Sequence, residues 1–200
     1  MDIATILGAV AGFGFLAGIR LYATVLVAGL LIRFQWITLP EHLSQLSVLG
    51  DTWVLAIAGL AFLIEIAADK IPYLDSFWDA VHTFIRPAGA ALIGLAAAGS
   101  LSPAWHVILF LLGGGVALTT HAAKAGTRAA VNASPEPVSN VVLSTIEDVF
   151  VVAGTWLVVS HPFLALFLVT ALLVVAALIL RKIYRFLRER LRRGWAWLMA

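Results

Sequence analysis

Apolar residues dominate the chain in long runs that short polar segments separate. A helix that crosses a bilayer needs about 20 predominantly apolar residues. Six runs approach or exceed that length, at about residues 3–32, 53–68, 85–99, 104–121, 141–159 and 162–180. The pattern therefore predicts an all-α integral membrane fold, with a bundle of about six transmembrane helices over residues 1–180.

The first run is longer than one upright span requires. Its first half contains four glycines, and the run has a single charged residue, Arg20. We expect this run either to tilt or to break near the arginine. Its glycines form two small-xxx-small pairs, a spacing that allows helix backbones to approach closely in lipid. The pairs are Gly8 with Gly12 and Gly14 with Gly18.

Composition excludes an ordinary soluble domain. Hydrophobic residues make up 62% of the 200 residues and charged residues 12%, with a mean hydropathy of +1.01. Soluble chains average about 25% charged residues. The absence of cysteine excludes disulfides, thiolate metal sites and cysteine nucleophiles.

The C-terminal residues differ from the rest. Residues 181–193 hold seven basic residues and one acid, and apolar side chains continue at helical spacing through position 198. This pattern is typical of an amphipathic helix that lies on the cytoplasmic leaflet and attracts anionic lipid. We therefore treat residues 181–200 as a basic cytoplasmic tail. Nucleic acid is not an expected partner, because basic residues cluster only in this tail.

The distribution of lysine and arginine predicts the orientation. With six spans, both termini lie on one side, together with two long polar segments that we expect to be loops, residues 69–86 and 122–140. These segments and the tail hold eleven lysines and arginines, against Arg33 alone on the opposite side. The positive-inside rule then places both termini in the cytoplasm.

Most of the remaining charge falls in two windows, residues 65–86 and 121–148. Outside the tail the chain has 16 charged residues, and eleven of them lie in these windows. Glu65 and Asp69 are four residues apart, so they share one helix face. A second face of the first window carries Asp75, Asp79, His82 and Arg86.

The second window combines a basic face with two acids inside a span. His121, Lys124 and Arg128 share a helix face. Asn132 and Asn140 flank a turn that contains two prolines. Two adjacent acids, Glu147 and Asp148, lie about two turns into the next apolar run. At that depth a charge is costly unless it is paired.

The two windows together form the candidate substrate- or ion-binding site. Its members are Glu65, Asp69, Lys70, Asp75, Asp79, His82, Arg86, His121, Lys124, Arg128, Asn132, Asn140, Glu147 and Asp148. We expect Glu147 and Asp148 to pair with basic residues of both windows. The expected partners are Lys70, Arg86, Lys124 and Arg128. The alternative is that these residues only form salt bridges that hold helical hairpins together.

The chain has no P-loop, HExxH or GxSxG motif. This favours a non-enzymatic role and indicates no cofactor. One alternative stays open, a divalent cation such as Mg²⁺ or Mn²⁺ at Asp75, Asp79 and His82, because these are oxygen and imidazole ligands at helical spacing. Arg86 lies beside them and would compete for the same carboxylates.

Two internal similarities indicate different repeats. The two span–window–span units resemble parallel repeats, whereas the strings AGIR at 17–20 and AGTR at 125–128 favour an inverted three-plus-three arrangement. Both arrangements stay open on the sequence.

Several strings in the windows point to one family. They are ADKIP at 68–72, LD at 74–75, WD at 78–79, HTFIRP at 82–87, KAGTR at 124–128, SPEP at 134–137, SN at 139–140, and Ser144 with ED at 147–148. In these strings the chain resembles the domain-of-unknown-function 4126 family of small bacterial polytopic membrane proteins. The resemblance covers about residues 10–160 and leaves out the basic tail. It implies a multi-pass protein of the bacterial inner membrane and brings no reaction with it.

Three functions fit these observations. The first is an inner-membrane transporter or channel for a small charged solute or ion. The second is a lipid-headgroup-binding protein, either a flippase or a lipid-modifying enzyme, because basic residues lie beside carboxylates at headgroup depth. The third is a structural membrane subunit. A homo-oligomer is compatible with all three.

Overall fold

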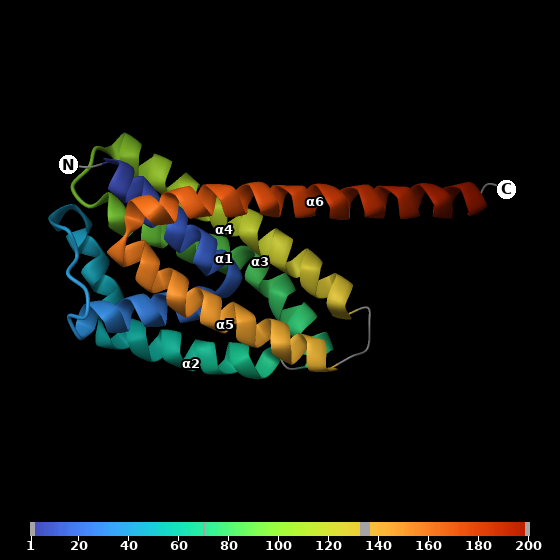
Figure 1. Cartoon of the computed structure of the whole chain (residues 1–200), viewed down its shortest axis with the longest axis horizontal. Helices are drawn as coiled ribbons and strands as arrows, with labels where there is room; N and C mark the ends of the chain where they lie inside the picture. The colour runs from blue at the N-terminus through green and yellow to red at the C-terminus, as the bar shows by residue number, and fades with distance from the viewer. Residues whose placement is uncertain (1–2, 70, 133–136, 199–200) are drawn as a thin grey trace.

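The computed structural model describes residues 3–69, 71–132 and 137–198, with the backbone alone at positions 72, 73, 75, 130, 132, 137–140, 187 and 189–198. Every regular element in these ranges is a helix (Figure 1). The elements are α1 (Ile3–Arg33), η1 (Glu41–Gly50), α2 (Thr52–Ala68), α3 (Pro72–Ala98), α4 (Pro103–Asn132), α5 (Pro137–Ser160) and α6 (Pro162–Leu198).

The helices have the length and apolar character of membrane spans. Within the described residues, five helices are long enough and apolar enough to cross a membrane. A sixth candidate span results if η1 and α2 count as one bent unit. The helices also present large apolar side chains outward, such as Trp53, Phe84 and Phe167. A soluble protein rarely exposes so much apolar surface. The prediction of an all-α integral membrane fold, with about six helices long and apolar enough to span a membrane, is confirmed on these grounds.

Helix α1 folds back on itself at Arg20. The backbone there has φ −148° and ψ 94°, far from helical values. Gly8 in the first arm lies against Pro162, where α6 begins. Gly29 in the second arm lies against Leu49, just before α2. The starts of α2 and α6 are at the same end of the bundle (Figure 1), so α1 is a re-entrant hairpin whose break lies inside the protein.

The hairpin changes the topology that the sequence predicts. The prediction of a tilt or break near Arg20 is confirmed as a break. Because both ends of α1 lie at one end of the bundle, Ile3 and Leu198 lie at opposite ends of the molecule (Figure 1). The prediction that both termini share one side is therefore wrong. It counted α1 as a full crossing on length alone.

The glycines of α1 are the positions of closest helix packing. Gly8 and Gly12 face the junction of α5 and α6, and an added Cβ at Gly12 would collide with Val158. Gly14 and Gly18 face α4, where an added Cβ at Gly14 would lie 2.8 Å from the Gly113 carbonyl oxygen. The two predicted small-xxx-small pairs therefore serve two different neighbours.

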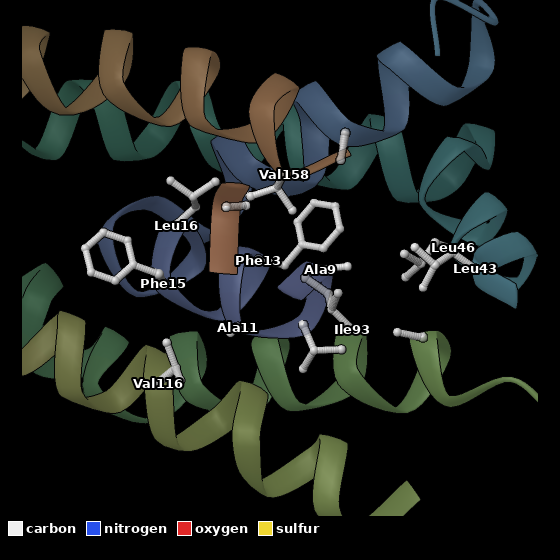
Figure 2. Packing of buried hydrophobic residues seen from close by; sticks show 14 of the residues in the cluster. Ala9, Ala11, Phe13, Phe15, Leu16, Leu43, Leu46, Ile93, Val116 and Val158 are labelled. Atoms are coloured by element: carbon white, nitrogen blue, oxygen red, sulfur yellow. The ribbon is translucent and has the colours of Figure 1, made fainter. Parts of the chain in front are cut away.

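Helix α1 also supplies the middle of the apolar core. Figure 2 shows Phe13 and Leu16 of α1 beside Val158 of α5, with Ile93 of α3 and Val116 of α4 on the other side. Leucines 43, 46 and 49 of η1 are buried against the same cluster. Their spacing of three residues matches the 3₁₀ period, which places them on one face.

The two polar segments predicted as loops are largely helical. Helix α3 begins at Pro72 rather than near residue 85, and α4 continues to Asn132. Pro87 consequently lies inside α3 instead of opening a span. Most of the charged side chains that the structure describes in these segments have partners on neighbouring helices. Neighbouring helices also make an internal proline tolerable.

Helix α6 continues without interruption from the last span into the basic segment (Figure 1). An added Cβ at Gly126 of α4 would collide with Ile183, so α6 still packs against the bundle where the basic segment begins. Arg181, Lys182 and Arg185 are exposed. The interfacial position expected for residues 181–200 stays a prediction.

The three consecutive glycines of α4 permit a matched test of this packing. An added Cβ at Gly113 would lie 2.6 Å from the Ala90 carbonyl oxygen of α3, whereas Gly115 has nothing within 4 Å. We expect Gly113→Ala to lower the free energy of unfolding by about 1–3 kcal/mol through overpacking. Gly115→Ala should be neutral or stabilise by up to about 1 kcal/mol, since alanine favours the helix. Thermal unfolding in detergent measures both, and equal effects would contradict this packing.

Candidate functional site

The predicted charged residues meet in one buried cluster at the break of α1. It draws on the end of α2, the first half of α3, the second half of α4 and the middle of α5. The predicted members found there are Glu65, Asp69, Asp79, His82, Arg86, His121, Lys124, Arg128, Glu147 and Asp148. All are buried except Glu147 and Asp148, which are partly exposed. We call this set, together with Arg20, the charge cluster.

Arg86 organises one side of the cluster. Its guanidinium donates to the Glu65 carboxylate at 2.7 Å and to the Asp79 carboxylate at 3.0 Å. It also donates to Nδ1 of His121 at 2.7 Å. Arg86 and Glu65 have no exposed surface, so this is an ion pair removed entirely from solvent. Such hydrogen bonds between charged groups are among the strongest in proteins.

The two histidines are held in defined neutral tautomers by their partners. Because Nδ1 of His121 accepts from Arg86, the proton is on Nε2, which lies 3.0 Å from the Asp79 carbonyl and 3.1 Å from Thr83 Oγ1. His82 Nδ1 donates to the Trp78 carbonyl at 2.8 Å. Its Nε2 lies 3.1 Å from the Tyr22 hydroxyl, from which it accepts when the ring is neutral. Tyr22 thus connects the second arm of α1 to this histidine.

Arg20 organises the other side of the cluster. Its guanidinium contacts Asp69 through Nη2 and Asp148 through Nε at 2.9 Å. It also donates to Oγ of Ser144 at 2.6 Å and lies 3.6 Å from Glu147. Arg20 has no exposed surface. The residue at which α1 reverses is therefore held by α2 and α5 together.

Lys124 and Arg128 join the two sides. Arg128 donates to both oxygens of Glu147, at 3.3 and 2.8 Å, and lies 3.8 Å from Asp69. Lys124 lies 3.2 Å from Glu147 and 4.0 Å from Asp79. It also donates to the Ile19 carbonyl at 3.0 Å, a backbone group at the α1 break. The pairing of Glu147 with Lys124 and Arg128 was predicted.

Arg20 is the site residue that the sequence analysis missed. Two signals were present: a lone arginine in an apolar run, and the similarity between AGIR and AGTR. The structure relates these two strings, because Arg20 and Arg128 both contact Oδ2 of Asp69 and Oε2 of Glu147. The two arginines thus share the same pair of carboxylate oxygens.

Several carboxylate oxygens of the cluster have no hydrogen-bond donor among the described residues. They include Oε2 of Glu65, Oδ1 of Asp69 and Oδ2 of Asp79. A buried polar atom without a partner costs about 1–3 kcal/mol. The described cluster also contains four basic side chains and five carboxylates. Its chemistry therefore suits the binding of a proton, a cation or water at these oxygens.

Four predicted site residues are not part of this geometry. Lys70 and the side chains of Asp75, Asn132 and Asn140 lie outside the described residues. The divalent-cation alternative included one of them, Asp75. Of its other members, Asp79 pairs with Arg86, and both ring nitrogens of His82 have partners. Among the side chains that the structure describes, no group of three acids or histidines is arranged for a metal.

Two hollows reach the charge cluster. A cavity of about 190 Å³ between α3 and α4 is lined by three alanines and by the polar residues Asp79, Arg128, Ser76 and Thr83. A second hollow of about 230 Å³ lies among α1, α4, α5 and α6 and reaches Lys124 and Glu147. The cluster is therefore buried but adjoins cavities on two sides.

Comparison with known proteins identifies one family. A model of the family described as "Domain of unknown function (DUF4126)" matches residues 7–182. The match includes every described member of the charge cluster. No curated protein and no solved structure matches the chain.

Proposed function

We propose, from the premise that this chain belongs to the DUF4126 family, that it transports or conducts a small charged solute or ion across a membrane. In this proposal the charge cluster is the binding site. The family description assigns no reaction, so the proposal depends on the geometry of the site.

The observation that supports transport most directly is the break of α1 inside the charge cluster. Irregular backbone at membrane depth is tolerated where protein or a water-filled cavity surrounds it. Discontinuous helices of this kind build the binding sites of many transporters. Here the break brings Arg20 to Asp69 and Asp148 and the Ile19 carbonyl to Lys124.

The ion pairs of Glu147 allow this carboxylate to exchange one basic partner for another. Glu147 contacts Arg20, Lys124 and Arg128 within 3.6 Å, so it can release one partner while it keeps another. A cation or proton arriving at Glu147 or Asp148 would compete with these basic groups, and an anion would compete with the carboxylates. We assign the access route to the cavity that Asp79 and Arg128 line.

The orientation follows from the same lysine and arginine bias, applied to the observed topology. Helices α2 and α4 end, and α3 and α5 begin, at the end of the bundle toward which α6 extends (Figure 1). The basic segment 181–193 belongs to that end. We place this end in the cytoplasm of a bacterial inner membrane. The beginning of α1 and Arg33 then face the opposite compartment.

Asp148→Asn tests the proposal directly. Asp148 is the most exposed acid of the cluster, at 29%, and Arg20 retains Asp69 and Glu147 without it. We expect the folded protein to survive and the flux of the transported ion to fall about tenfold or more, equivalent to losing about 1.4 kcal/mol of interaction. Purified protein is reconstituted in liposomes, and protons, sodium, potassium, chloride and phosphate are each tested as the moving ion.

The matched control is Asp51→Asn. Asp51 is an exposed carboxylate that caps α2 by accepting from the Trp53 amide at 2.8 Å, and asparagine caps equally well. Its flux should equal that of the unmodified chain. The proposal is wrong if none of the five ions crosses faster than in protein-free liposomes, or if Asp148→Asn carries the ion at the unmodified rate.

A further inference from the structure

A lateral groove made of two adjacent hollows lies between α5 and α6. The two helices meet near Ser160 and Pro162 and then diverge (Figure 1). The larger part of the groove is a hollow of about 580 Å³ whose walls come from α1, α5 and α6. It shares Phe15 and Leu172 with the 230 Å³ hollow that reaches Lys124 and Glu147. The groove therefore leads from apolar walls to the side chains of Lys124 and Glu147.

We infer that this groove binds one phospholipid, with an acyl chain between α5 and α6 and a zwitterionic ethanolamine headgroup at Lys124 and Glu147. The inference goes beyond the proposed transport. It requires only that the groove is occupied in the membrane, and it would hold for a protein that moves no ion.

The dimensions of the groove favour an acyl chain. Its lining extends along α6 from Ala165 to Ile179, about 21 Å at 1.5 Å per residue. This is more than half of the roughly 30 Å hydrocarbon thickness of a bilayer. The groove is therefore long enough for a lipid acyl chain.

The polar end of the groove carries both signs of charge. Lys124 and Glu147 lie 3.2 Å apart and both line the hollow. Thr120 and Thr127 line it as well. A lipid phosphate suits Lys124, and a primary ammonium can donate to Glu147. Glu147 also contacts Arg128 at 2.8 Å and Arg20 at 3.6 Å, so an ammonium would share this carboxylate with them. A purely anionic headgroup has no group that could pair with Glu147, and this difference favours phosphatidylethanolamine over phosphatidylglycerol.

The test fills the apolar part of the groove. Ala171 lines the groove and is exposed, whereas Ala177 is exposed on the same helix but outside the lining. Full-length protein in detergent is mixed with equal amounts of phosphatidylethanolamine, phosphatidylcholine and phosphatidylglycerol, and native mass spectrometry counts the retained lipids. We expect one phosphatidylethanolamine per chain. Ala171→Trp should retain it about tenfold less, since displacing about two methylene groups suffices, and Ala177→Trp should retain it fully.

A second variant tests the groove if Ala171→Trp proves to be misfolded. If the melting temperature of Ala171→Trp differs from that of the unmodified chain, Ala153→Trp is used instead, because Ala153 lines the opposite wall on α5. Loss of lipid in this variant and retention in Ala177→Trp would support the site. Absence of retained lipid, a preference for phosphatidylglycerol, or equal retention in the groove and control variants would overturn it.

Discussion

Arg86→Met is expected to destabilise the folded chain by about 3–5 kcal/mol, because it leaves a buried carboxylate without its partner. Glu65 has no exposed surface and lies 2.7 Å from the guanidinium. The Asp79 carboxylate and Nδ1 of His121 would lose a donor as well. No other described arginine of the cluster has a fully buried glutamate at such short distance.

A double-mutant cycle separates the cost of an orphaned charge from the cost of lost packing. We expect Arg86→Met combined with Glu65→Gln to recover a large part of the stability, because the combination leaves Glu65 uncharged. The melting temperature in detergent should fall by about 10 °C in the single variant. Additive effects of the two substitutions would contradict a buried ion pair between these residues.

Arg20→Ala is expected to have the second largest effect, again about 3–5 kcal/mol, because three carboxylates depend on this guanidinium. Asp148 would lose its contact with Nε, Asp69 would retain only Arg128 at 3.8 Å, and Ser144 would lose a donor at 2.6 Å. The substitution also removes the side chain that holds the reversal of α1 in place. Ion flux should therefore disappear together with stability.

Two further variants give this prediction its controls. Arg20→Lys retains the charge but cannot present two nitrogens to two acids, so we expect only partial recovery of the melting temperature. Arg33→Ala removes the other arginine of α1, which donates to the Gly50 carbonyl and Thr52 at the exposed end. It should cost no more than about 1 kcal/mol. Similar losses for Arg20→Ala and Arg33→Ala in thermal unfolding would contradict the role assigned to Arg20.

The sequence predicted the charge cluster well because its members follow helical spacing. Asp79, His82 and Arg86 repeat every three or four residues, and so do His121, Lys124 and Arg128. Such spacing places side chains on one face whatever the neighbouring helices do. The depth of Glu147 in an apolar run then required basic partners, and two of those predicted, Lys124 and Arg128, contact it.

The sequence could not predict where the helices begin and how α1 runs. A hydropathy pattern assigns polar stretches to loops. Asp79 and Arg128, however, are buried in helices, so the pattern places the helix boundaries wrongly. The length of α1 likewise indicates a crossing. The reversal of α1 depends on contacts of Arg20 with Asp69 and Asp148, which are distant in the sequence. The residues around Arg20 contain no pattern from which those contacts could be predicted.

The reversal of α1 also bears on how the protein is made. Arg20 and Ser144, which share a 2.6 Å hydrogen bond, are 124 positions apart. At about 5–20 residues per second, the ribosome adds the second about 6–25 s after the first. The contacts that α5 makes with Arg20 therefore cannot form until the chain has been synthesised past residue 144. During that interval the reversal of α1 is without its partners on α5.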